Sequence, residues 1–235
     1  MTRCFSSLKK KRTPSDSRRF TRVAKNLPNW RIVRYADDFV IMTNGSREDA
    51  ERLQEQVAGV LAGLGLRLSP SKTRVVHMAD GFDFLGFHIK WMRKRGSNKW
   101  HVYTFIAKKP IQALKAKIRS LTRKLSHLDY RVALIRINQI QRGWANYFKH
   151  AVAKHTFQRI ANFVWWRIVR WVMHRNRMTW KAIRRWLHMP QGWQTIEFDG
   201  IELLLAQHAD HAHELSTELE WTRSRRDDAG VLVHL

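Results

Sequence analysis

Two short apolar runs flank a pair of acids in the sequence RIVRYADDFVIMT, residues 31–43. β-Branched and aromatic residues dominate both runs, from Arg31 to Tyr35 and from Phe39 to Thr43, and this composition is typical of β-strands. Because only three residues separate the runs, the two strands can be joined only through a tight connection. The sequence therefore predicts a hairpin that carries Asp37 and Asp38 at its exposed turn.

The residues after this hairpin predict a helix and then further antiparallel strands. Ser46, followed three residues later by Asp49, has the pattern of a capping box at a helix start. Apolar residues then recur at helical spacing as far as Gly65, namely Leu53, Val57, Val60, Leu61 and Leu64. Strand patterns follow in RVVHM, FDFLGFHIKW and WHVYTFIA, with ADG as the turn between the first two. Residues 29–107 thus have the plan of an α+β fold.

Residues 108–188 predict a small bundle of helices. Pro110 suits the first turn of a helix, and apolar residues then repeat at intervals of three and four. These residues are Ile111, Leu114, Ile118, Leu121 and Leu125. Further helices are expected at 130–150, 156–175 and 179–188, each with an apolar stripe beside Arg and Lys.

Positive charge is concentrated on this helical part of the chain. The formal net charge is +25, and residues 108–187 hold 20 Lys and Arg against one acid, Asp129. Such a field attracts polyphosphates and makes their binding dependent on salt, so it predicts a nucleic-acid partner. Residues 1–28 form a polar basic arm, whereas residues 189–235 turn acidic and have no assigned role.

Cysteine content and hydropathy exclude further classes of protein. The single cysteine, Cys4, excludes an internal disulfide and a cysteine zinc cluster, and it fits a reducing, cytoplasmic location. The most apolar stretch, FVWWRIVRWVM, is too short to span a bilayer and contains Arg167 and Arg170. No membrane partner is expected, and a basic helix resting on an anionic membrane surface is the less favoured alternative.

The two adjacent carboxylates suit a hard cation. Mg²⁺ prefers carboxylate oxygens and takes its remaining ligands from water and substrate phosphates. Two such ions can clamp the attacking and leaving oxygens of a phosphoryl transfer. Asp37 and Asp38 are therefore candidate metal ligands, although aspartate is also common in ordinary turns.

Three motifs in order resemble those of reverse transcriptases. YADDFVIMT resembles the catalytic box, LGLRLSPSKT (64–73) places Lys72 as the palm lysine, and FDFLGFHI (82–89) resembles the primer-grip hairpin. QRGWANYFKHA (141–151) is similar to the signature of the group II intron maturase, the helical thumb that follows the palm.

The resemblance implies a partial reverse-transcriptase palm at 29–107 and a helical maturase thumb at 108–188. It implies catalytic and Mg²⁺-binding roles for Asp37 and Asp38. It also implies nucleic-acid contacts from Lys72 and from the hairpin residues Leu85, Gly86 and Phe87.

The lopsided charge adds candidate contacts with the RNA backbone on the predicted helices. They are Lys115, Arg119, Arg123, Arg142, Lys149, Lys154, Arg167 and Arg170. Trp144, Tyr147 and Phe148 are interpreted as helix core in preference to base-stacking groups. Gly143 is expected to allow close helix packing.

The chain departs from the family pattern in ways that bear on function. A palm needs a third carboxylate from an upstream strand, but the one acid before the box is Asp16, which has no apolar strand around it. The Gly-rich, Pro-Gln-containing stretch of the family is missing, and so are the paired cysteines of its endonuclease domain. We therefore expect the C-terminal part of an intron-encoded protein, one that does not polymerise DNA alone.

Three functions remain open from the sequence. The leading hypothesis is a maturase fragment that binds group II intron RNA and promotes its folding and splicing. The second is an RNA-directed DNA polymerase that uses Mg²⁺ and a DNA primer or target once a missing N-terminal part is supplied. The third is a relic without function.

The acidic tail, residues 189–235, supports two smaller statements. Its HADHAHE run (208–214) receives no metal assignment. Its charge alone suggests that the tail covers the basic helices when RNA is absent.

Overall fold

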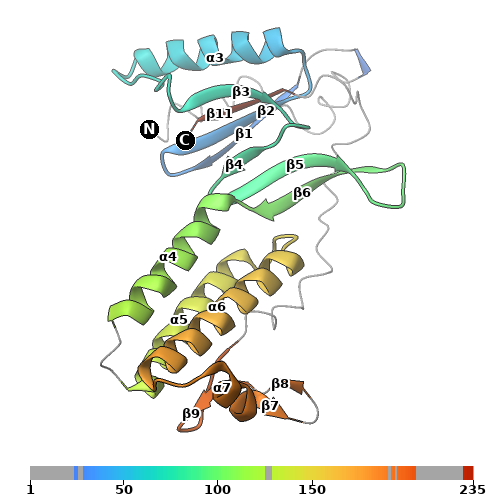
Figure 1. Cartoon of the computed structure of the whole chain (residues 1–235). Helices are drawn as coiled ribbons and strands as arrows, with labels where there is room; N and C mark the ends of the chain where they lie inside the picture. Colours follow the sequence, from blue (N-terminus) through green and yellow to red (C-terminus); the bar gives the residue numbers. More distant parts are fainter. Residues whose placement is uncertain are drawn as a thin grey trace. The chain divides into compact units, whose positions relative to one another are not determined.

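The computed structural model describes residues 24–25, 29–124, 129–189, 192–193, 195–204 and 230–234. Antiparallel strands predominate in the first half of the described chain and helices in the second, and the α+β fold class is confirmed (Figure 1). The chain divides into two compact units. We call residues 1–103 with 217–235 the sheet unit, and residues 104–216 the helical unit.

Among the described residues of the sheet unit, a four-stranded sheet packs against a helix. The elements are β1 (Trp30–Tyr35), β2 (Asp38–Thr43), α3 (Arg47–Ala62), β3 (Thr73–His77) and β11 (Gly230–His234). The strand order is β1-β2-β11-β3, and every neighbouring pair is antiparallel. α3 lies along one face of this sheet (Figure 1). β11 lies within residues 189–235, for which no role was predicted from the sequence.

The predicted hairpin is confirmed in its position. Tyr35 pairs with Asp38, so the connection between β1 and β2 consists of two residues, Ala36 and Asp37. Trp30, Ile32, Phe39 and Ile41 are buried in a cluster beneath α3. The apolar residues of the motif therefore build the core, while Asp37 lies in the turn and Asp38 is the first residue of β2.

Helix α3 begins as the capping box predicts. The Ser46 side chain accepts a hydrogen bond from the Asp49 amide, and the Asp49 carboxylate accepts one from the Ser46 amide. Leu53, Val57 and Leu61 are buried as expected. The helix ends at Ala62, however, so the expectation that Leu64 continues the apolar face is wrong and its side chain is 51% exposed. Two glycines, at 63 and 65, explain the earlier end because glycine disfavours helix.

A second, three-stranded sheet has the order β4-β5-β6. Its strands are β4 (Phe82–Phe84), β5 (Phe87–Arg93) and β6 (Trp100–Ile106). The strand pattern of FDFLGFHIKW is wrong as a single strand, because Leu85 and Gly86 have φ of 50° and 81° and turn the chain back. The hairpin that the resemblance implies at FDFLGFHI is present, since β4 pairs with β5 in antiparallel fashion. ADG likewise does not close a hairpin, since it connects β3 of one sheet to β4 of the other.

Gly81 precedes β4 at a position that only glycine tolerates. Its φ is +81°, and a Cβ built there would lie 2.8 Å from Nε2 of His88 and 3.0 Å from the carbonyl oxygen of Ile89. His88 cannot swing aside freely because its Nδ1 is 2.7 Å from a carboxylate oxygen of Asp83. We predict that Gly81→Ala lowers the free energy of unfolding of the sheet unit by about 3 kcal/mol. Urea denaturation followed by circular dichroism measures this change.

Gly96→Ala is the matched control for this substitution. Gly96 has a similar φ of +76°, but nothing lies within 4 Å of its added Cβ. Only the backbone strain should remain there, which costs about 1 kcal/mol. Equal losses for the two variants would contradict the proposed clash at Gly81.

The helical unit contains the predicted helices. They are α4 (Lys108–Lys124), α5 (Tyr130–Phe148), α6 (Lys154–Arg175) and α7 (Trp180–Leu187). Short paired strands follow, β7 (His188–Met189) with β8 (Gly192–Trp193) and β9 (Glu197–Phe198) with β10 (Ile201–Glu202). Leu114 and Ile118 of α4 are buried against α5 and α6 as their spacing predicts.

Some expectations fall outside the described residues. These concern most of the basic arm with Cys4 and Asp16, the apolar residue Leu125, and the tail segment 205–229 with its histidine run. Across the part of the chain that is described, no helix has the length and apolarity needed to cross a membrane.

Candidate nucleic-acid interface

Basic side chains gather along the line where α4 packs on α6. Lys115, Arg119 and Arg123 follow one another at intervals of four on α4, so they share a face. Phe163, Arg167 and Arg170 share a face of α6 for the same reason. We call the five cations Lys115, Arg119, Arg123, Arg167 and Arg170 the basic seam.

An aromatic ring of α6 holds two cations of α4. The Lys115 Nζ lies 5.2 Å from the centre of the Phe163 ring, and the Arg119 Cζ lies 5.0 Å from it. A cation over an aromatic face is attracted by the ring quadrupole, whose negative lobe lies over that face. Phe163 therefore fixes both side chains beside α6 without neutralising their charge.

A buried hydroxyl orients Arg167. The Arg167 Nε donates a 2.7 Å hydrogen bond to Thr122 Oγ1 on α4, and Thr122 is 4% exposed. The Thr122 hydroxyl in turn directs its hydrogen at the carbonyls of Ile118 and Arg119, at 3.1 and 3.0 Å. Because the acceptor is itself held by the backbone, the guanidinium of Arg167 is positioned before any ligand arrives.

The seam carries positive charge that the described residues leave uncompensated. Partial burial lowers the pKa of Arg167, and the charges of Arg123, Arg119 and Arg170 lower it further. The ion pairs found among the described residues all lie in the sheet unit. Asp129, the one acid in residues 108–187, caps the start of α5, where its carboxylate accepts a hydrogen bond from the Arg131 amide. An anion placed at the seam would therefore relieve repulsion as well as form new bonds.

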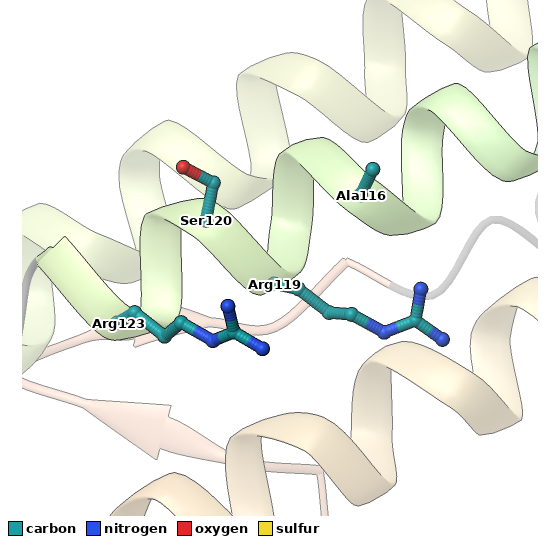
Figure 2. A pocket seen from close by; sticks show the side chains of 4 residues that line it. All are labelled: Ala116, Arg119, Ser120 and Arg123. Atoms are coloured by element: carbon teal, nitrogen blue, oxygen red, sulfur yellow. The ribbon is translucent and has the colours of Figure 1, made fainter.

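A pocket of about 370 Å³ opens on α4 within this region, lined by Ala116, Arg119, Ser120 and Arg123. Figure 2 shows Arg119 and Arg123 extending from the same side of α4, with both guanidinium groups directed toward the neighbouring helix. Arginine forks match phosphate oxygens in pairs, and Ser120 adds a hydroxyl. The arrangement can hold successive phosphates of a nucleic-acid backbone.

The other predicted RNA contacts on the helices lie outside the seam. Arg142 is exposed on α5, Lys149 is exposed at the C-terminal cap of that helix, and Lys154 is exposed at the start of α6. Nothing in the structure tests their roles, so they stay predictions.

The maturase-like motif is largely structural. Phe148 is buried, and Trp144 packs on the helical core at 4.8 Å from Phe148 and 5.5 Å from Phe157, measured between ring centres. The core interpretation is wrong for Tyr147, which is 55% exposed. The expectation that Gly143 allows close helix packing is wrong as well, since nothing lies within 4 Å of a Cβ built there.

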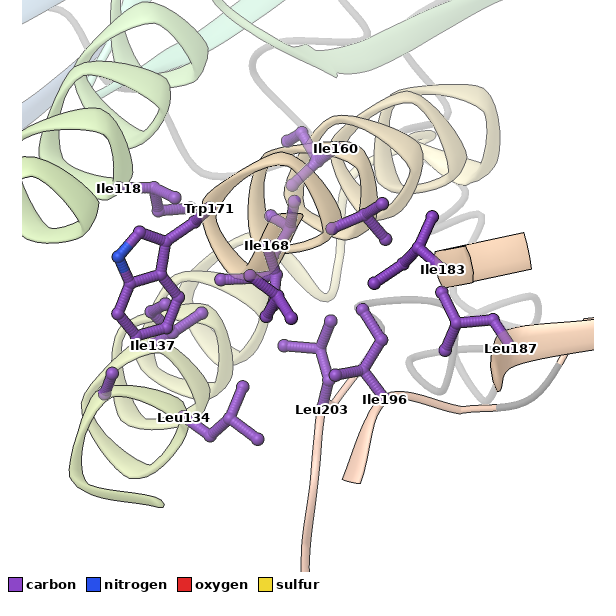
Figure 3. Close-up of a cluster of buried hydrophobic side chains, with 14 of the residues drawn as sticks. Ile118, Leu134, Ile137, Ile160, Ile168, Trp171, Ile183, Leu187, Ile196 and Leu203 are labelled. Carbon is purple, nitrogen blue, oxygen red and sulfur yellow. The ribbon is translucent and has the colours of Figure 1, made fainter. Parts of the chain in front are cut away.

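Gln141, the first residue of that motif, anchors the segment that follows α7. Its side-chain amide donates a 2.8 Å hydrogen bond to the Leu204 carbonyl. Asn138, on the same helix, donates a hydrogen bond to the Glu202 carbonyl and accepts one from the Leu204 amide. Ile196 and Leu203 enter the helical core beside α5 and α6 (Figure 3). Residues 195–204 thus belong to the helical unit even though their composition is acidic.

In the sheet unit, the predicted site residues occupy two turns and a loop. Lys72 is exposed just before β3, and Leu85 and Gly86 form the turn that leads to Phe87 in β5. At the first turn, Ala36 has a φ of 50°, a conformation that alanine rarely adopts. The Ala36 carbonyl accepts a 2.6 Å hydrogen bond from Arg34 Nε. This turn leaves Asp37 exposed and Asp38 half-buried.

The carboxylates at the β1–β2 turn supply only part of a ligand set for Mg²⁺. Among the described residues, no group of three or more His, Cys, Asp or Glu side chains could hold a metal ion. Two carboxylates alone do not provide the ligands of a two-ion phosphoryl-transfer site. We therefore derive no polymerisation step from Asp37 and Asp38.

Two known protein families match the two parts of the chain, in agreement with the resemblance found in the motifs. Residues 3–89 match the family described as reverse transcriptase (RNA-dependent DNA polymerase). Residues 111–190 match the group II intron, maturase-specific domain. This chain belongs to the group II intron-encoded reverse transcriptases and maturases. The reverse-transcriptase match begins at residue 3, so it includes residues that the motifs alone assign to a basic arm.

Individual relatives match parts of the chain that differ in length. Protein YkfC of Escherichia coli is 48% identical over 63 residues, which are 26% of this chain and 16% of that protein. Group II intron-encoded protein LtrA of Lactococcus lactis subsp. cremoris is 39% identical over 70 residues, 29% of this chain and 12% of that protein. An uncharacterized 91 kDa protein in the cob intron of Schizosaccharomyces pombe is 26% identical over 186 residues, 67% of this chain and 23% of that protein. The chain spans less than a quarter of each of these relatives.

Two residues that shape the interface were absent from the sequence prediction. Thr122 and Phe163 carry no charge, so a search for basic side chains passes over them. Their signal is spacing: Phe163 lies four residues before Arg167, and Thr122 is directly followed by Arg123. Thr122 is a polar residue next to the apolar repeat of α4, and this position could have marked it as a partner for Arg167.

Proposed function

We propose that this chain is a maturase fragment derived from a reverse transcriptase, and that it binds group II intron RNA through the basic seam. The observation that supports it is the convergence of five cations around Phe163 and Thr122 with no acidic partner among the described residues. Screening and positioning of intron phosphates would favour the compact RNA fold that splicing requires. The proposed location is the cytoplasm, because the single cysteine fits a reducing compartment.

Binding of the intron RNA to the purified full chain tests this function. We expect the chain to prefer structured intron RNA over a random RNA of equal length, and its affinity to fall steeply as salt rises. Equal affinity for the two RNAs at every salt concentration would contradict a maturase role. It would favour a protein with general affinity for polyanions.

RNA-directed DNA polymerisation is the second candidate, supported by the reverse-transcriptase match and by Asp37 at an exposed turn. It would need Mg²⁺, a DNA primer or target and further ligands from another polypeptide. We propose it only for a complemented protein.

Replacing both acids separates the two candidates. We predict that Asp37→Asn with Asp38→Asn changes the RNA affinity less than twofold and leaves support of intron splicing intact, because the proposed RNA contacts lie on α4 and α6. Splicing of a reporter intron and filter binding measure these two quantities. Primer extension by the unmodified chain alone, lost in this variant, would show instead that the chain is a competent polymerase.

A further inference from the structure

Strand β11 fills the inside of the four-stranded sheet although its neighbours β2 and β3 come from a distant part of the sequence (Figure 1). It is antiparallel to both. Position 231 lies in register with Met42 of β2 and Val76 of β3, and position 232 lies in register with Ile41 and Val75. The pairing therefore continues along the strand on both of its edges.

The sheet is built to hold one strand at this place. Ile41 and Val75, on either side of β11, belong to the same core cluster beneath α3. Val40 and Val76 belong to a second cluster, which contains Met42 as well. Because neighbouring strands lie about 4.8 Å apart, the pairing of β11 with both neighbours sets β2 and β3 two such spacings apart. The gap between them accepts a single extended strand.

An empty gap would leave without partners the backbone groups of β2 that point toward β11, because the opposite edge of β2 alone is paired, with β1. Val40 and Ile41 are only 2% and 1% exposed when β11 is in place, so an empty gap would also uncover apolar surface. The sequence of β11, GVLVH, contains the β-branched residues that favour strands. Residues 205–229 stand between β11 and the described end of the helical unit, and the entropy cost of closing such a segment grows only slowly with its length.

We propose that the gap between β2 and β3 is a strand-acceptor site, which Gly230–His234 fills within the same chain. When that segment is removed, the site binds an extended, apolar strand of another polypeptide, antiparallel to both neighbours. This is recognition by strand addition, in which main-chain hydrogen bonds give affinity and the alternating faces give register. The inference concerns the sheet unit alone and does not depend on RNA binding.

A disulfide tests which segment occupies the site. In the full chain with Cys4→Ser, Met42→Cys and Val231→Cys occupy directly paired positions. Paired residues of antiparallel strands lie within the Cα distance that a disulfide spans. We expect mild oxidation to link them within one chain at least tenfold faster than the control pair Met42→Cys with Leu232→Cys, which is out of register by one residue. Equal rates, no link, or a link between two chains would overturn the proposal.

A second measurement tests the acceptor. Leu232→Pro removes a backbone donor that an inner strand needs, whereas Leu232→Val keeps the pairing. We expect hydrogen exchange at residues 40–42 and 74–76 to quicken about 100-fold in the proline variant and to stay unchanged in the valine variant. The peptide GVLVHL, added in excess, should restore protection, whereas the peptide GVPVHL, in which proline replaces the first leucine, should not. Unchanged exchange in Leu232→Pro, or no recovery with the peptide, would refute an acceptor site.

Discussion

Replacing Arg119, Arg123 and Arg167 together by glutamine is expected to weaken binding of intron RNA about 100-fold at physiological salt. Each arginine lost removes a charge-assisted contact with phosphate worth roughly 1 kcal/mol, and 1.4 kcal/mol corresponds to a factor of ten in affinity. The dependence of log affinity on log salt should also become flatter by about 2, because fewer counterions are released. Filter binding over a range of salt concentrations gives both values.

A second triple variant separates the seam from total charge. Arg131 and Arg136 of α5 and Arg184 of α7 are exposed side chains outside the seam. Their replacement by glutamine removes the same number of charges, but we expect the affinity to fall less than tenfold. If the two triple variants lose affinity equally, position on α4 and α6 does not matter, and the seam is not the binding site.

Ile168→Ala is expected to destabilise the helical unit by about 3 kcal/mol. Ile168 is fully buried on α6, in the cluster that also contains Leu134, Ile137 and the later residues Ile196 and Leu203 (Figure 3). Removing three carbons there takes away their burial and leaves a cavity that close-packed helices fill only in part. Urea denaturation of the full chain, followed by circular dichroism of the helices, measures the change.

Two further variants serve as controls for this loss of stability. Ile168→Val deletes one methylene and should cost about 1 kcal/mol, and Val132→Ala, at a site 37% exposed, should cost less than about 0.5 kcal/mol. A loss below 1 kcal/mol for Ile168→Ala would show that α6 is not packed as described. The same variant should bind RNA normally well below its unfolding transition, since the seam does not include Ile168.

Local rules in the sequence predicted much of the fold. The Ser46 capping box, the apolar spacing of α4 and the tight connection before Asp38 each depend on residues within a few positions of one another. Such interactions are encoded where they occur, so propensity and periodicity suffice to find them. The strand pattern alone missed the turn at Leu85 and Gly86, because apolar residues continue through it, whereas the resemblance to a hairpin placed it correctly.

Pairings between distant segments could not be predicted in this way. β11 lies between β2 and β3, and its five residues give no signal of their partners. Leu203 is buried in the helical core within a stretch whose composition is acidic, because Gln141 and Asn138 bind its backbone neighbours. For the candidate site, charge identified the arginines, but the groups that orient them, Thr122 and Phe163, became evident only once α4 and α6 were placed side by side.

Photochemical crosslinking of the full chain to its intron RNA, with the linked peptides identified by mass spectrometry, tests the central proposal most directly. If the basic seam holds the RNA backbone, the crosslinks should concentrate in residues 115–123 of α4 and 163–170 of α6, and they should disappear from both helices in the triple glutamine variant. Crosslinks confined to residues 1–28 and to the sheet unit, with α4 and α6 unlabelled, would contradict it.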